Sequence, residues 1–134
     1  MRCIQKMKKK IILVLFLLAG NSLFALDIYE EIANSIRSGD ARQLASYFSN
    51  TIDLTVLGKE NVYSKAQGEL ILKDFFGKNP PKSFTILHKG SSPEGAQYAI
   101  GNLITASGKT IRTSFYFKSV NGKIIIQEFR LESD

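Results

Sequence analysis

The second half of the sequence alternates apolar and polar residues in segments separated by turn residues, and this pattern constrains the fold more than any other. Between Ser83 and Leu131 we expect four strands, because successive side chains of a strand point to opposite faces of a sheet. Asn121-Gly122 separates the last two, and both residues tolerate the positive φ angles of a type I′ turn. The pattern predicts an antiparallel sheet built from consecutive hairpins.

The same alternation assigns side chains to faces. We expect Phe84, Ile86 and His88 to share one face of the first of these strands. On the next strand, a shared face is predicted for Tyr98, Ile100, Asn102 and Ile104, and Gly101 predicts a bulge. On the third strand, an apolar set alternates with a polar set: Ile111, Thr113, Phe115 and Phe117 against Arg112, Ser114, Tyr116 and Lys118.

The first half of the chain predicts helices around one hairpin. A helix is expected over residues 27–38, with Gly39 ending it, and Asp40 is expected to cap a short second helix. A strand over 51–57 is followed by a turn at 58–61 and a short return strand at 62–63. Ser64 with Gln67 predicts a third helix start. In that helix Leu70, Ile71, Phe75 and Phe76 are expected to pack on the sheet, with Gly77 as its stop.

This order of elements predicts an α+β fold. Helices segregated from a run of strands pack on one face of a curved antiparallel sheet, and together they form a cone. Residues 26–134 are expected to be one domain, since about 109 residues suffice for a single core.

The first 25 residues have the order of a secretory signal peptide. Lys8-Lys9-Lys10 precedes an apolar run from Ile11 to Ala19, and small residues lead to a predicted cleavage after Ala25. The run is shorter than the ~20 residues that span a bilayer. We therefore expect a periplasmic or secreted protein. An uncleaved membrane anchor or a buried helix is the alternative, and Met7 is an alternative start to Met1.

Charge and cysteine content exclude several classes of function. The chain has 18 Lys+Arg and 12 Asp+Glu, but five of the cations lie in the leader, so the remainder carries 13 − 12 = +1. No basic block remains for nucleic-acid binding. The single cysteine, Cys3, also lies in the leader, so we expect no disulfide, thiol nucleophile or cysteine-based metal site. The sequence has no Gly-rich phosphate-binding loop, and we expect no cofactor.

Several short segments carry a family resemblance. They are Ser38-Gly39-Asp40-Ala41, Tyr47-Phe48, Tyr63-Ser64-Lys65 to Gln67, Asp74-Phe75-Phe76 and His88-Lys89-Gly90. With the order of elements, they resemble the nuclear transport factor 2-like superfamily, also called ketosteroid-isomerase-like or cystatin-like cones. Within it they look like an uncharacterised family of small secreted Bacteroidetes proteins. The resemblance implies a fold and a compartment, but no chemistry, because this fold carries isomerases, dehydratases and non-catalytic modules alike.

Two residues are weak candidates for catalysis. Asp53 is an acid in the middle of the predicted strand 51–57, and in the resembled isomerases a pocket carboxylate moves a proton. Alternation favours an exposed Asp53 on the face opposite Ile52 and Leu54. His88 is the only histidine and suits acid–base chemistry, although a hydrogen-bonded histidine at a strand end is the simpler interpretation.

Tyrosines and one asparagine are weak candidates for ligand binding. A tyrosine hydroxyl can act as the oxyanion donor of the resembled isomerases, but tyrosines also fill cores and rims. The candidates are Tyr47, Tyr63, Tyr98 and Asn102, with Tyr116 as a further possible donor. Asn102 is either a bulge residue or a polar group of a pocket.

The polar set on the third strand has two interpretations. A face with Arg112, Ser114, Tyr116 and Lys118 is typical of a solvated sheet surface. It also fits a homodimer interface, since arginine and tyrosine are enriched at interfaces. We keep Arg112 and Tyr116 as interface candidates.

These patterns lead to three hypotheses about function. The first is a non-catalytic envelope module that binds a small apolar ligand or an envelope protein, and the alternative is a proton-transfer enzyme that uses Asp53 or His88. An enzyme requires a cavity with convergent polar groups, whereas a protein-binding module predicts a filled cone with an apolar or aromatic patch on the sheet. A purely structural dimer is the third.

Overall fold

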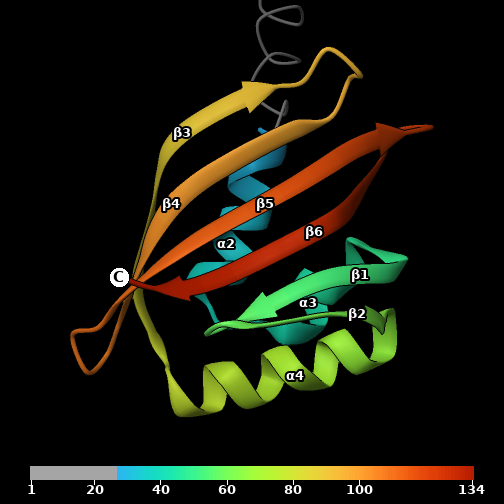
Figure 1. Cartoon of the computed structure of the whole chain (residues 1–134). Coiled ribbons are helices and arrows are strands. Elements are labelled where there is room, and N and C mark those ends of the chain that lie inside the picture. Colours follow the sequence, from blue (N-terminus) through green and yellow to red (C-terminus); the bar gives the residue numbers. More distant parts are fainter. Residues whose placement is uncertain (1–26) are drawn as a thin grey trace, which may run out of the picture.

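A computed structural model describes residues 27–134, and the predicted signal peptide lies outside the described residues. Three helices and six strands follow one another along the chain (Figure 1). The helices are α2 (Ile28–Arg37), α3 (Ala41–Ser46) and α4 (Lys65–Lys78). The strands are β1 (Phe48–Val56), β2 (Lys59–Ser64), β3 (Pro81–Ser91), β4 (Gln97–Thr105), β5 (Thr110–Val120) and β6 (Lys123–Ser133).

All six strands form one curved sheet in the order β2-β1-β6-β5-β4-β3. The expected α+β fold is confirmed, and β3 to β6 pair antiparallel through consecutive hairpins. One pairing differs from the expectation, because β1 lies parallel to β6, with Leu54 opposite Phe129. The sheet is therefore mixed, and the β1–β2 hairpin belongs to the same sheet as β3 to β6 because β1 pairs with β6.

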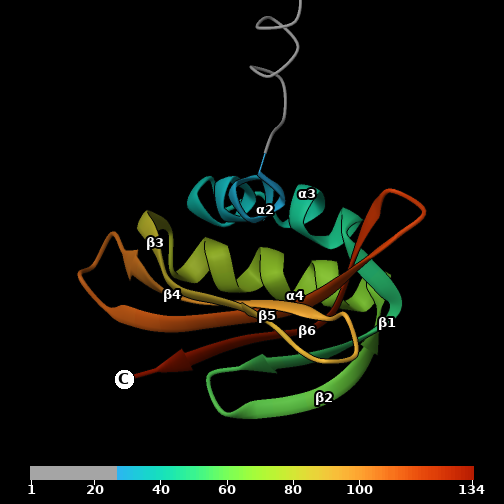
Figure 2. The same ribbon diagram turned by 90° about the horizontal axis from the view of Figure 1, so that it is seen from above.

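The sheet has one covered and one uncovered face. Figure 2 shows the three helices on the same side of the sheet. The side chains toward the helices form the inner face and supply most of the core, including Phe115, Phe117, Phe129 and Leu103, all fully buried. Side chains on the opposite side form the outer face, over which the described residues place no helix.

Helix and turn signals in the sequence act locally as expected. Asp40 accepts a hydrogen bond from the Gln43 amide at 3.0 Å and so caps α3. Ser64 and Gln67 form a complete capping box at the start of α4. Asn121 and Gly122 have φ angles of 52° and 77°, so both adopt the left-handed region that a type I′ turn requires.

Three local expectations were wrong. The first hairpin turns at Leu57-Gly58 rather than 58–61, with φ angles of 49° and 88°, so β2 starts at Lys59. Gly77 does not stop α4, which continues to Lys78 and ends at Asn79, followed by the prolines. Leu70 is 64% exposed, and Leu72 takes its place in the core.

Side chains occupy backbone groups at both edges of the sheet. At β2, the Val62 amide donates to Asn61 Oδ1 at 2.8 Å, and the Ser64 amide donates to Gln67 Oε1 at 3.2 Å. At β3, Arg37 from α2 donates to the Phe84 carbonyl at 3.0 Å. These contacts leave fewer free groups for another strand to pair with.

No helix within residues 27–134 has the length and apolar character needed to cross a membrane.

Candidate functional site

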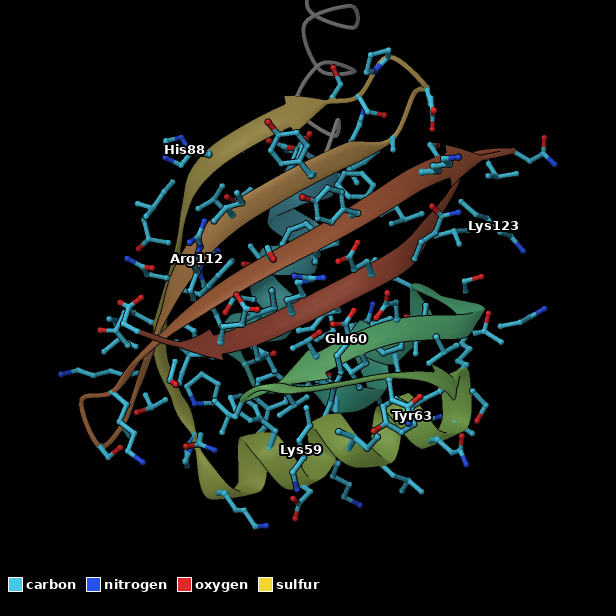
Figure 3. All side chains as sticks on the ribbon, viewed as in Figure 1. Lys59, Glu60, Tyr63, His88, Arg112 and Lys123 are labelled. Atoms are coloured by element: carbon cyan, nitrogen blue, oxygen red, sulfur yellow. The ribbon has the colours of Figure 1, made fainter. Side chains whose placement is uncertain are left out.

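His88 lies on the outer face, and this corrects the expectation that it shares a face with Phe84 and Ile86. The register of β3 with β4 shifts between Ile86 and His88, because Leu87 is an extra residue that has no partner. After this bulge His88 pairs with Ile100, an outer-face residue, and is exposed. Figure 3 shows His88 at the β3 edge of the sheet, with its side chain directed away from the other labelled residues.

Asp53 also lies on the outer face, as alternation favours, but it is half-buried rather than exposed. It pairs with Val62 on one side and Glu128 on the other. Its Oδ1 atom is buried and has no hydrogen-bond partner among the described residues. Asp53 on β1 and His88 on β3 are separated by β6, β5 and β4. With ~4.8 Å between strands they are roughly 19 Å apart, too far to act on one substrate atom.

An ion-pair cluster lies at the centre of the outer face. Arg130 Nε donates to Glu128 Oε1 at 2.6 Å, and the guanidinium lies 3.6 Å from Glu60 and 3.9 Å from Glu132. The carboxylates come from β2 and β6, since the register brings Glu60, Thr55 and Arg130 into one row. The hydrogen bond to Glu128, together with its negative charge, raises the pKa of Arg130 above its ordinary value. Arg130 therefore stays charged.

Arg112 and an aromatic pair flank this cluster. Arg112 is exposed, pairs across the sheet with Asn102 and Glu132, and makes no ion pair with the described residues. Tyr98 and Tyr116 are cross-strand partners, with their ring centres 5.6 Å apart. The ring of Tyr98 lies over Gly90, where any side chain would collide with it.

These residues surround a shallow hollow of about 320 Å³ on the outer face. Its lining has both charge signs and little apolar surface: Ile100, Arg112, Ser114, Tyr116, Glu128, Arg130 and Glu132. We call this set the outer-face cluster. Within residues 27–134, no group of three or more His, Cys, Asp and Glu side chains is placed to hold a metal ion.

The ligand-binding candidates do not converge. Tyr47 follows α3 and accepts a hydrogen bond from Gln43 at 3.0 Å, on the helical side of the molecule. Tyr98 and Asn102 lie on the outer face, because the inner face of β4 is formed instead by Ala99, Gly101, Leu103 and Thr105. The space between sheet and helices is filled by buried side chains, so the cone holds no shared pocket for these tyrosines.

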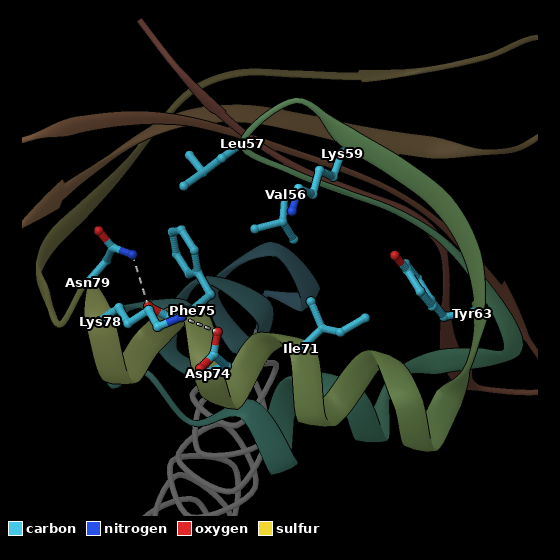
Figure 4. Close-up of a pocket in the computed structure, with 9 residues that line it drawn as sticks. All are labelled: Val56, Leu57, Lys59, Tyr63, Ile71, Asp74, Phe75, Lys78 and Asn79. Carbon is cyan, nitrogen blue, oxygen red and sulfur yellow. Dashed lines mark hydrogen bonds and ion pairs between the residues drawn. The ribbon is translucent and has the colours of Figure 1, made fainter.

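Tyr63 belongs to a second hollow, a groove between α4 and the β1–β2 hairpin. The groove has a volume of about 370 Å³ and an apolar floor (Figure 4). Its lining consists of Val56, Leu57, Lys59, Tyr63, Ile71, Asp74, Phe75, Lys78 and Asn79. Lys59 and Tyr63 reach it because they lie on the same side of β2 as their inner-face partners Val56 and Ile52.

Sequence reasoning missed the residues at the centre of both sites. Glu128, Arg130 and Glu132 recur at every second position of the last strand, and that alternation signals one charged face. Glu60 and Lys59 carried no such signal. Their positions depend on the Leu57-Gly58 turn and on the parallel pairing of β1 with β6, which brings Glu60 to Arg130.

Comparison with known proteins gives a family and a fold. A family model described as "Domain of unknown function (DUF4783)" matches residues 29–132. No curated protein matches the chain. The match confirms the expected resemblance to an uncharacterised family.

Solved structures agree with the family match. A DUF4783 family protein from Bacteroides fragilis YCH46 is 24% identical with a TM-score of 0.73, over 81% of this chain and 100% of that one. Another, from Bacteroides ovatus ATCC 8483, is 22% identical with a TM-score of 0.71, over 78% and 93%. A putative dehydratase of the NTF2-like family from Streptomyces avermitilis is 8% identical with a TM-score of 0.58, over 79% and 90%. At these identities the likeness concerns the fold, and it confirms the nuclear transport factor 2-like architecture.

Proposed function

The chain belongs to the DUF4783 family, whose function is unknown, and we propose that it is an exported, non-catalytic module that binds protein through the outer face of its sheet. The first partner we propose is a second copy of the same chain. The observation that carries the proposal is the outer-face cluster itself, an ordered set of both charges beside an aromatic pair that no helix covers.

The charges of the outer face suit a copy of the same face. Arg130 is surrounded by Glu60, Glu128 and Glu132, so carboxylates outnumber it three to one. Arg112, one strand away, makes no ion pair with the described residues. In a two-fold dimer each Arg112 meets the acidic cluster of the other copy, and the contact is made twice.

The size of the outer face is sufficient for a stable dimer. Six strands at a spacing of ~4.8 Å give a width of roughly 24 Å, and strands of about ten residues give a length of roughly 33 Å. The product, about 800 Å², equals the area of ~800 Å² per partner that a standard interface buries. Side chains already engage three backbone groups at the β2 and β3 edges, which disfavours strand addition and favours the face as the route of association.

The arrangement gives no support to the proton-transfer enzyme. Asp53 and His88 lie on separate strands of the outer face, and neither points into an enclosed cavity. A general base acts within hydrogen-bonding distance of its substrate and needs a second polar group nearby. The filled interior and the solvent-facing charges favour binding over catalysis.

Export remains part of the proposal and has its own test. We expect the protein from its native host to start at Leu26, at the predicted cleavage position. Mass spectrometry of the purified protein measures this. An intact N-terminus in the cytosolic fraction would contradict export without affecting the binding surface.

The dimer is tested by sedimentation equilibrium of a chain that starts at Leu26. We expect a monomer–dimer equilibrium with a dissociation constant below ~100 µM, and at least a tenfold weaker dimer for Arg112→Glu, because the new carboxylate faces the acidic cluster. Arg42→Glu is the matched control, since Arg42 is an exposed arginine on α3 away from the sheet. A monomer at ~0.5 mM, or equal weakening by both variants, contradicts the proposal.

A further inference from the structure

We propose that the groove between α4 and the β1–β2 hairpin binds a single-chain alkyl carboxylate, with the chain on its apolar floor and the carboxylate at Lys59. The groove lies on the helix side of the hairpin, whereas the outer-face cluster lies on the other side of the sheet. The inference is therefore independent of the proposed dimer.

The floor of the groove is apolar and comes from two elements. Phe75 and Ile71 lie one helical turn apart on α4, and Val56 and Leu57 face them from the end of β1 (Figure 4). Phe75 is 3% exposed, while Leu57 is 47% exposed despite its size. An alkyl chain laid against Leu57 removes the exposed apolar surface of Leu57 from water, at a gain of ~25 cal/mol per Å², while the buried Phe75 ring forms the floor beneath it.

The polar groups at the groove favour an anion. Asp74 is neutralised by Lys78 at 3.1 Å, one helical turn away. Lys59 makes no ion pair with the described residues, so the lining carries two lysines and one aspartate, a net charge of +1. Figure 4 shows the Tyr63 hydroxyl directed toward the groove from β2. A carboxylate can accept hydrogen bonds from both Lys59 and Tyr63.

The chemistry of the Lys59 ammonium group limits which ligand head groups can bind. A lysine is a compact point charge, and the lining contains no arginine that would match a phosphate or a second carboxylate bidentately. One free cation and one hydroxyl fit a head group with a single negative charge. A zwitterionic or cationic head group would place a positive charge beside Lys59 and is disfavoured.

The volume of the groove limits the length of the alkyl chain that it can hold. About 370 Å³ lies near the lower end of the ~300–1,000 Å³ range of ligand pockets. A second hollow of about 540 Å³ begins at Leu57 and Asn79, which line both, and continues to Ile111. An alkyl chain of medium length fills the groove, and a longer alkyl chain reaches past Leu57 into the second hollow.

The test is titration with sodium decanoate below its micelle concentration, followed by amide NMR shifts and calorimetry. We expect saturable binding with shifts centred on Leu57, Tyr63 and Ile71. Lys59→Met keeps the length of the side chain and removes its charge, and we expect at least fivefold weaker binding. Lys123→Met is the matched control, because Lys123 is exposed at the far hairpin of β5 and β6 (Figure 3).

Matched ligands and sites decide the outcome. Decyltrimethylammonium carries the same chain with a positive head, and we expect it to bind at least fivefold more weakly than decanoate. Equal binding of the two ligands, equal affinity for Lys59→Met, or shifts confined to the outer face would each overturn the proposal. Ile71→Phe narrows the groove without adding charge, so undiminished decanoate binding by a folded Ile71→Phe protein would also overturn it.

Discussion

Phe115 and Tyr116 are neighbours in the sequence, yet they belong to two surfaces of one sheet that differ in almost every property. Phe115 is fully buried on the inner face, where its ring stacks on that of Phe129 with 6.4 Å between the ring centres. Tyr116 is 37% exposed on the outer face. The inner face is apolar and covered by helices, and the outer face carries the Arg130 ion pairs. The inner face thus holds the fold together, and the outer face is free to carry a function.

The largest expected loss of stability comes from a substitution on the inner face. Phe115→Ala removes a fully buried ring, and we expect a loss of ~3–5 kcal/mol in the free energy of unfolding. Urea denaturation followed by circular dichroism measures it. A loss below ~1 kcal/mol would mean that the inner face does not dominate stability.

A glycine on the inner face gives the next largest effect. A Cβ at Gly101 would collide with the Thr85 carbonyl oxygen and lie 2.9 Å from the Phe84 ring, so the adjacent strand must shift. For Gly101→Ala we expect a loss of ~1–3 kcal/mol, measured by the same denaturation. Gly77→Ala is the control, because a Cβ there meets nothing within 4 Å and alanine favours the helix, so it should stabilise by up to ~1 kcal/mol.

Tyr116→Ala sharpens the comparison at the adjacent residue. It removes the contact with Tyr98 on the outer face, and we expect a loss of about 0.5–1.5 kcal/mol in the free energy of unfolding, the usual contribution of an aromatic pair. The dimer should nevertheless weaken at least tenfold, as measured by sedimentation equilibrium. A loss of stability as large as that of Phe115→Ala would place both residues in one core and remove the distinction.

The smallest effect is expected at Arg130. Surface ion pairs contribute ~0–1 kcal/mol, and the Arg130 side chain is 36% exposed, so Arg130→Met should lower stability by less than ~1 kcal/mol. In the variant, Glu60, Glu128 and Glu132 are left as neighbouring like charges. The difference from the parent protein should therefore shrink in ~1 M salt, where charges are screened within ~3 Å. A difference that does not change with salt would mean that Arg130 acts through packing.

Elements governed by neighbouring residues could be predicted from the sequence. The caps at Asp40 and Ser64 and the Asn121-Gly122 turn depend on contacts within four positions, and all three are confirmed. The alternation along β5 was also sufficient to assign Phe115 and Tyr116 to opposite faces of the sheet, because a regular strand has a period of two.

The features that could not be predicted from the sequence depend on contacts between residues distant in the chain. The extra residue Leu87 reverses the faces after it, so the expected face of His88 was wrong. The adjacent apolar residues Ile86 and Leu87 interrupt the alternation, but the pair alone does not show that one of them is an extra residue. Tyr98, Ile100, Asn102 and Ile104 formed the bulkier set of β4, but Gly101 lies inside because the Phe84 ring takes the space of its side chain. The outer-face cluster could not be predicted either, since the parallel pairing of β1 with β6 joins residues at least 75 positions apart, such as Thr55 and Arg130.

The occupied edges of the sheet have a consequence for the size of the assembly. Asn61, Gln67 and Arg37 engage three backbone groups at the two edges, so edge-to-edge pairing with another sheet is less favourable. A pair joined face to face also buries the surface that joined it. In the proposed dimer, assembly would therefore end at two subunits, and the protein concentration would set the number of dimers but not the length of a fibre.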